Sequence, residues 1–140
     1  MTAGGEEGGP ERRELDAFVE GFIAAWNRHD AAAMATHWVE DGDLLNTRGH
    51  HARGRAAVEQ LLASEHAGPM LSTHTEMKVV STRTLAPGLV LADARMTVEG
   101  VRMADGQTRP IPMQVAFVAT RRPEGWRYVA VRPYAFTGGF

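Results

Sequence analysis

The sequence contains no cysteine and no apolar run that approaches the roughly 18 residues of a membrane span. Without cysteine the chain has no disulfide, no thiolate nucleophile, no cysteine zinc site and no iron–sulfur cluster. The first ten residues, MTAGGEEGGP, include two acids and lack the apolar core of a signal peptide. We therefore expect a cytoplasmic protein that does not associate with membranes.

The chain also lacks an excess of charge of either sign. It has 15 basic and 17 acidic residues, which give a net charge of -2. A nearly neutral chain has no strong field that would draw it to nucleic acid or to anionic lipid. Hydrophobic residues make up 44% and charged residues 23%, which is typical of a globular protein, and 140 residues suit one domain. We expect a flexible tail over residues 1–10 and a single domain over residues 11–140.

The first half of the chain has the apolar spacing of helices. One stripe with a 3.6-residue period predicts a first helix; its members are Leu15, Phe18, Val19, Phe22, Ile23 and Trp26. Asp30 is placed to cap a second, short helix over residues 31–34. A third helix is expected from about Arg55, and the Gly-Pro pair at residues 68–69 ends it.

The second half is rich in β-forming residues. Four stretches, at residues 73–85, 89–103, 109–121 and 126–134, are separated by short breaks that favour antiparallel hairpins. Before them, an acidic turn at residues 40–42 leads to a short strand at residues 44–45. Helices followed by a meander of strands predict an α+β fold. Strands of ten or more residues curl, and helices over the concave face would enclose a cone-shaped space.

Several stretches together resemble the nuclear-transport-factor-two-like superfamily: residues 25–30 (AWNRHD), 38–46 (WVEDGDLLN), 54–58 (GRAAV) and 125–131 (GWRYVAV). Within it the chain resembles the SgcJ/EcaC-type branch, which is related to SnoaL-like polyketide cyclases. The resemblance implies a conical fold with three N-terminal helices on the concave face of a curved, mostly antiparallel sheet. It also implies a homodimer, a hydrophobic polyene or cyclic ligand, and biosynthetic enzymes of enediyne antibiotics as partners.

Steroid isomerases of the same superfamily use a carboxylate base, a tyrosine and a protonated aspartic acid. Alignment with them places the tyrosine at Phe22, the base at Asn46 and the acid near Met113 or Gln114. None of these side chains supplies the required group, so the isomerase mechanism is disfavoured. The chain also has no dinucleotide-binding fingerprint and no helical pair of metal-ligating histidines, so we expect neither a cofactor nor a metal.

Eight residues are candidates for contact with the ligand: Phe22, Trp26, Trp38, Asn46, Gln114, Phe117, Arg132 and Tyr134. The aromatic ones either fill the core or stack on a flat polyene. Asn46 either orients a ligand carbonyl or bonds to the backbone of the nearby turn. On the last strand, alternation groups residues 126, 128, 130, 132 and 134 on one face. Arg132, where the family often has histidine, is then either a cation at the cavity or a surface charge.

The sequence leaves two functions open. In the first, the chain binds a polyene or cyclic intermediate of polyketide or enediyne biosynthesis and assists its cyclisation, isomerisation or release. Catalysis would then be of cyclase or isomerase type without a cofactor, and the sequence assigns no catalytic residue. In the second, the chain is a non-catalytic ligand carrier or a dimeric accessory module for a partner enzyme.

Overall fold

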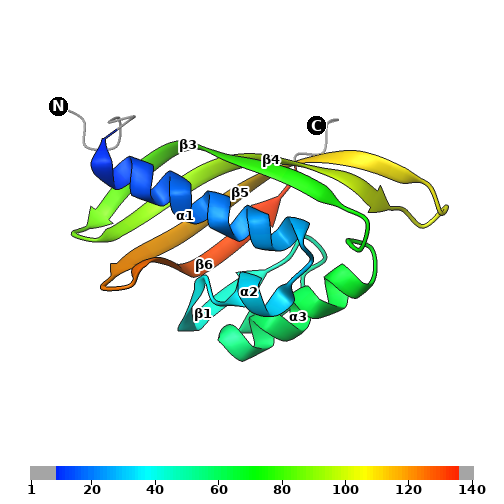
Figure 1. Ribbon diagram of the computed structural model, residues 1–140, viewed down its shortest axis with the longest axis horizontal. Helices are drawn as coiled ribbons and strands as arrows, with labels where there is room; N and C mark the ends of the chain where they lie inside the picture. The colour runs from blue at the N-terminus through cyan, green and yellow to red at the C-terminus, as the bar shows by residue number, and fades with distance from the viewer. Residues whose placement is uncertain (1–8, 136–140) are drawn as a thin grey trace.

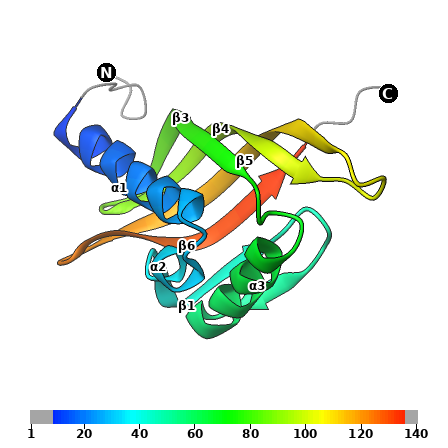
Figure 2. The same ribbon diagram turned by 45° about the vertical axis from the view of Figure 1, so that its right-hand side comes forward.

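Three helices lie against one face of a six-stranded sheet in the computed structural model, which describes residues 9–135 (Figures 1 and 2). The helices are α1 (Pro10–Asn27), α2 (Ala31–Ala35) and α3 (Arg55–Ala67). The strands are β1 (Trp38–Leu45), β2 (His51–Arg53), β3 (His74–Ala86), β4 (Leu89–Arg102), β5 (Thr108–Arg122) and β6 (Gly125–Tyr134). The expected tail falls mostly at residues 1–8, outside the described residues, and Pro10 already begins α1.

The sheet is mixed and open, with the strand order β2-β1-β6-β5-β4-β3. Strands β3 to β6 form the expected antiparallel meander, and β6 then pairs in parallel with β1. This single parallel pair brings the last strand beside the first one. The expected α+β architecture, with helices on a curved, mostly antiparallel sheet, is confirmed.

The helices begin and end where the sequence indicates. Pro10 occupies the first turn of α1, where its missing N–H is not needed. The Asp30 side chain accepts a hydrogen bond of 3.0 Å from the Ala33 N–H and so caps α2. The α1 stripe is buried against the sheet, and Phe22 makes edge-on contacts with Trp38 and Tyr128. None of the helices among residues 9–135 is long and apolar enough to cross a membrane.

The expected acidic turn at residues 40–42 is instead part of β1. The register between β1 and β6 shifts between Trp38 and Asp43, so this stretch forms a bulge within the strand. The Trp38 indole N–H donates to the Asp43 carbonyl across the bulge, at 2.8 Å. A Cβ atom at Gly42 would lie 3.0 Å from both Trp38 and the Tyr128 carbonyl, so only glycine fits there without a shift of its neighbours.

A second bulge changes the faces of β6. The register between β5 and β6 shifts where Val118 and Ala119 pair with Ala130 and Tyr128. Residues before the bulge point inward at even positions, as Trp126 and Tyr128 do, whereas Val131 is the buried residue after it. The strict alternation expected from residue 126 to residue 134 is therefore wrong, because one extra residue reverses the pattern.

Candidate functional site

A small cavity of about 70 Å³ lies between the helices and the concave face of the sheet. Its polar side chains are few: Asn46, Thr47, Glu65 and the hydroxyl-bearing Tyr128. Most of the wall is apolar, from Phe22, Trp26, Trp38, Leu44, Leu62, Met70, Met77, Met96, Met113, Val115, Val131 and Pro133. An apolar cavity with a few polar groups is the ordinary form of a small-molecule site.

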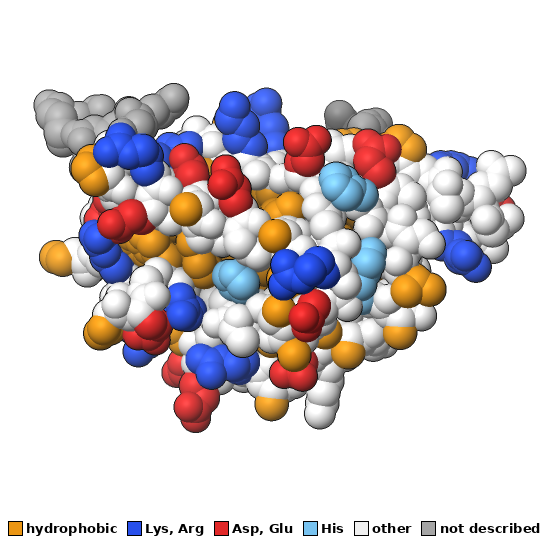
Figure 3. Space-filling model, in the orientation of Figure 1, with side chains coloured by type: hydrophobic (Ala, Val, Ile, Leu, Met, Phe, Trp, Pro, Cys, Tyr) orange, Lys and Arg blue, Asp and Glu red, His pale blue; other side chains and the backbone are white. Residues whose placement is uncertain are grey.

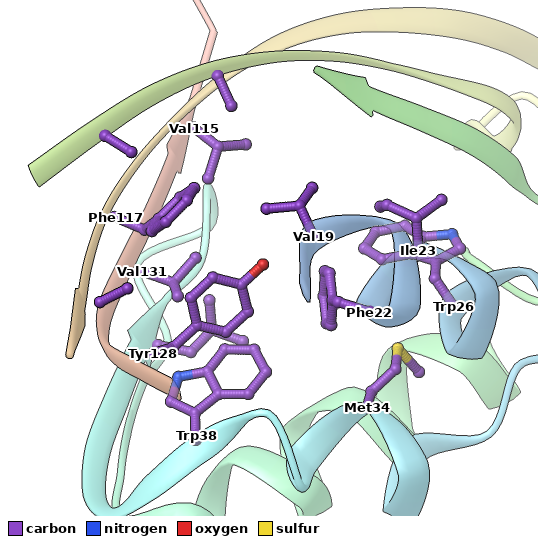
Figure 4. Close-up of a cluster of buried hydrophobic side chains, with 14 of the residues drawn as sticks. Val19, Phe22, Ile23, Trp26, Met34, Trp38, Val115, Phe117, Tyr128 and Val131 are labelled. Atoms are coloured by element: carbon purple, nitrogen blue, oxygen red, sulfur yellow. The ribbon is translucent and has the colours of Figure 1, made fainter. Parts of the chain in front are cut away.

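Tyr128 brings a hydroxyl into this apolar interior. The side chain is 1% exposed, and its hydroxyl has no hydrogen-bond partner among the described residues. Figure 4 shows the oxygen pointing away from β6 toward the space beside Phe22 and Val19. The ring is held by Trp38 at 4.9 Å and Phe117 at 5.0 Å between ring centroids. A buried donor without an acceptor costs free energy, and an added oxygen atom beside this hydroxyl would offset that cost.

Burial raises the pKa of Tyr128 well above its ordinary value. The phenol therefore keeps its proton throughout the physiological pH range and acts as a neutral hydrogen-bond donor.

Glu65 is the acid of the cavity, and Asn46 is its partner. The Asn46 Nδ2 donates to the Glu65 Oε2 at 2.8 Å, and both residues are buried. The Arg48 guanidinium lies 3.9 Å from the same carboxylate oxygen. Burial raises the pKa of Glu65 in spite of the Asn46 hydrogen bond and the charge of Arg48, which both act in the opposite direction. A carboxyl group whose pKa is raised by burial is a candidate for proton transfer.

Asn46 makes the turn-backbone bonds that the sequence offered as one of its two roles, and its orienting of a ligand carbonyl stays a prediction. Its Oδ1 accepts hydrogen bonds from the backbone N–H groups of Arg48 and His50, which shapes the turn after β1. Its amide nitrogen meanwhile holds Glu65 and lies in the cavity wall. One side chain thus fixes both the turn and the acid.

Next to the acid, His66 forms a second buried polar group. Its Nδ1 lies 2.9 Å from the Nδ1 of His29, so one of the two rings donates and the other accepts. Its Nε2 is buried without a partner, and the ring packs edge-on against Trp26 at 4.7 Å. Burial, with the nearby His29, lowers the pKa of His66 to about 4. His66 therefore lies outside the cavity lining and packs against Trp26, which is part of that lining.

The structure brings four of the eight candidate residues to the cavity: Phe22, Trp26, Trp38 and Asn46. Phe117 is 1% exposed and packs against the Tyr128 ring, behind the cavity wall. Gln114 lies between Met113 and Val115, which both line the cavity, so alternation turns it to the opposite face.

Arg132 and Tyr134 also lie away from the cavity, because the β6 bulge moves Val131 and Pro133 to the inner face instead. Arg132 binds Asp43 of β1, and Tyr134 is 38% exposed at the end of the strand.

Glu65, Tyr128 and the methionines are cavity residues that the sequence patterns did not single out. A signal for Glu65 was present, because it follows Val58 and Leu62 at the spacing of one helical stripe and so falls on the buried face of α3. Alternation grouped Tyr128 with Trp126 on one face without deciding which face is inner, and it could not show an unpartnered donor, since that property depends on every side chain around it. Among residues 9–135, no three His, Asp or Glu side chains are arranged to hold a metal ion.

Fold and cavity together define an α+β protein of the cystatin-like, nuclear-transport-factor-two-like type. The chain belongs to the SnoaL-like domain family, whose model matches residues 19–131. No curated protein matches the sequence.

Solved structures share the fold over most of their length. A protein with a cystatin-like fold from Caulobacter vibrioides has a TM-score of 0.80 at 21% identity, covering 93% of this chain and 92% of that one. An NTF2-like protein from Novosphingobium aromaticivorans has a TM-score of 0.72 at 23% identity, covering 92% and 84%. A ketosteroid isomerase-like protein from Erwinia carotovora atroseptica has a TM-score of 0.75 at 15% identity, covering 91% and 98%. These identities show a common fold and nothing of the chemistry.

Proposed function

We propose that this chain binds an apolar polyene or cyclic intermediate of polyketide biosynthesis, of the enediyne type in the SgcJ/EcaC branch, and assists its cyclisation, isomerisation or release. The observation that carries the proposal is the unpartnered Tyr128 hydroxyl, buried in an apolar cavity that also contains the Glu65 carboxyl. A conjugated ligand with one carbonyl oxygen would satisfy the hydroxyl and cover the aromatic wall.

The chemistry follows from the two polar groups. Tyr128 donates a hydrogen bond to the ligand carbonyl and stabilises the negative charge that develops on its oxygen as an enolate forms. Glu65 takes a proton from one carbon of the ligand and returns it to another, with Asn46 holding the carboxyl in place. The apolar wall excludes water from the reacting part of the ligand and holds that part beside the two polar groups.

Tyr128 and Glu65 carry the same kinds of functional group as the catalytic residues of a steroid isomerase, but they stand at different positions in the chain. Phe22 and Asn46 occupy the aligned positions of its tyrosine and its base and have neither function. In the proposal, Tyr128 of β6 supplies the hydroxyl and Glu65 of α3 supplies the acid, so the reaction would be related in type but differently oriented.

The test is to incubate the protein with candidate polyene intermediates and follow both binding and product. Tyr128→Phe and Glu65→Gln keep the shape of the cavity and remove one function each. We expect Glu65→Gln to bind ligand and form no product, and Tyr128→Phe to lose both affinity and rate. Absence of binding and of any change in product with the unmodified protein would overturn the proposal.

The second function, a non-catalytic carrier or dimeric accessory module, is favoured by one observation: the aligned isomerase positions Phe22 and Asn46 lack their catalytic groups. The same two variants separate the alternatives. A carrier would retain its effect on the partner enzyme when Glu65 becomes Gln. The homodimer and the cytoplasmic location stay predictions, and sedimentation analysis of the purified protein measures the first.

A further inference from the structure

Three methionines form a continuous row across the sheet. Met77 of β3 pairs with Met96 of β4, and Met96 pairs in turn with Met113 of β5. All three line the inner cavity, and Met70 joins them from the segment after α3. The wall of the cavity therefore combines four unbranched thioether side chains with aromatic rings.

Beyond this row lies a second, larger hollow. An open groove of about 610 Å³ runs along β3, between α1 and the neighbouring part of β4. Met77 and Met96 belong to the walls of both the groove and the inner cavity. Figure 3 shows hydrophobic side chains exposed among charged ones on this face of the molecule.

Two fixed points hold α1 to β3 on either side of Met77. The Asn27 Nδ2 donates to the Thr75 carbonyl, and the Thr75 N–H donates to the Asn27 Oδ1. The Arg12 Nη2 donates to the Val79 carbonyl at 2.7 Å. Met77 lies between Thr75 and Val79 on β3. Its flexible side chain therefore lies between the two points at which α1 is hydrogen-bonded to the strand.

The size of the inner cavity makes a second state necessary for the proposed function. An apolar cavity of about 150 Å³ accommodates benzene, and the inner cavity has about 70 Å³. A polyene therefore cannot lie wholly inside it. Methionine side chains change rotamer easily and adapt to irregular ligands. When Met77 and Met96 turn aside, the cavity and the groove become one space in the range of ordinary ligand sites, about 300–1,000 Å³.

We propose that the Met77–Met96–Met113 row is a gate between the groove and the inner cavity. The site takes an elongated, uncharged, conjugated molecule. One end of this molecule reaches Tyr128, and the rest lies in the groove. The groove presents cations such as Arg12 and Lys78 beside acids such as Asp16 and Glu76, so neither sign of ligand charge is favoured. This inference rests on the proposed function, because it adds an entry path and an elongated shape to the ligand proposed there.

Two measurements test the gate with diphenylhexatriene, a linear uncharged polyene that fluoresces in apolar surroundings. In the first, the methionine methyl groups are labelled with ¹³C and followed by NMR during addition of the probe. We expect the signals of Met77, Met96 and Met113 to move, and that of Met34 to stay, because Met34 is fully buried and lies outside the lining of both spaces.

The second measurement uses the absence of cysteine. A single Met77→Cys substitution is labelled with a bulky methanethiosulfonate reagent, which a reductant removes again. We expect the label to slow association of the probe by about tenfold or more, as a blocked entrance would, and reduction to restore the rate. The control is Met103→Cys, on the loop between β4 and β5 and outside both spaces, where the label should change the rate less than about twofold.

The outcomes separate the gate from the proposed function. If the unmodified protein binds the probe while the three methyl signals stay still and the label has no effect, the gate is wrong and the ligand enters elsewhere. If the unmodified protein binds neither this probe nor any other apolar ligand, the proposed function fails and the gate fails with it. Should the labelled protein unfold, the NMR measurement on the unsubstituted chain decides.

Discussion

Arg132 holds Asp43 with two hydrogen bonds, from Nη1 to Oδ1 at 2.7 Å and from Nη2 to Oδ2 at 3.0 Å. This bidentate pair joins β6 to β1, the one parallel pair of strands in the described sheet. His51 of β2 approaches the same carboxylate at 2.6 Å, so three neighbouring strands meet at Asp43. A residue that the sequence offered as a ligand contact is therefore a cross-strand link on the outer face.

Replacing Arg132 by Met should lower the free energy of unfolding by about 1 kcal/mol at pH 7, since the pair is partly exposed and solvent weakens it. The Arg132 hydrogen bonds, aided by His51, lower the pKa of Asp43. The stability they give is present above the ordinary carboxyl pKa and is lost as pH falls through the lowered pKa. The difference between variant and parent should thus disappear in strong acid. Urea unfolding at several pH values measures it.

The control for that measurement is Arg83→Met, an exposed arginine on β3. Its effect should stay within about 0.5 kcal/mol at every pH. An Arg132 effect that did not vary with pH would show that packing of its methylene groups, and not the ion pair, provides the stability.

Tyr128→Phe should leave the unliganded protein as stable as the parent, or more stable by up to about 1 kcal/mol, because it removes a buried hydroxyl without an acceptor. Affinity for a carbonyl-bearing polyene should fall by about tenfold, since the lost hydrogen bond is made only with the ligand. Thermal unfolding and fluorescence titration measure the two effects. A loss of stability above about 1 kcal/mol would mean that the hydroxyl already has a partner.

Glu65→Gln should raise stability at alkaline pH relative to the parent. Burial raises the pKa of Glu65, so the native state holds this proton more tightly than the unfolded state does. The parent therefore loses stability as pH rises from the ordinary glutamate pKa through the raised one, and glutamine does not. The Gln side chain keeps an oxygen for Asn46. Unfolding curves across this range give the effect, and a carboxyl ¹³C titration of the parent that showed no raised value would contradict it.

His66 should make the protein sensitive to acid between about pH 6.5 and 4. Its pKa falls to about 4 in the native state, so the unfolded state binds more protons in this window and stability rises with pH. His66→Phe keeps the edge contact with Trp26 and removes the titrating group, and its stability should change less over the window. His74→Phe, an exposed position on β3, is the control. Parallel pH curves for the parent and His66→Phe would refute this account.

Local signals in the sequence account for most of the fold. The α1 stripe, the Asp30 cap and the Gly-Pro stop placed the helices, and the breaks at residues 87–88 and 105–106 placed the long strands. The two bulges escaped prediction because they depend on packing between distant residues. The β1 bulge requires the Trp38 indole over Gly42 and beside the Tyr128 carbonyl, and no local pattern announces that contact.

The β6 bulge explains one part of the candidate site that could not be foreseen. Phe22 and Trp26 lie on the predicted stripe of α1, Trp38 begins β1 and Asn46 follows its end, and all four line the cavity. Arg132 follows the β6 bulge and points the other way. Whether the cavity residues bind a ligand stays a prediction that the experiments above decide.

The side chains that fasten α1 to β3 also affect how the molecule behaves in a crowded solution. β3 ends the sheet, and a bare terminal strand offers its peptide groups to any other chain in extended conformation. Asn27 already occupies both peptide groups of Thr75, and Arg12 occupies the carbonyl of Val79. A further strand could pair with this part of β3 only by displacing the Asn27 and Arg12 side chains, so α1 shields the first half of the terminal strand.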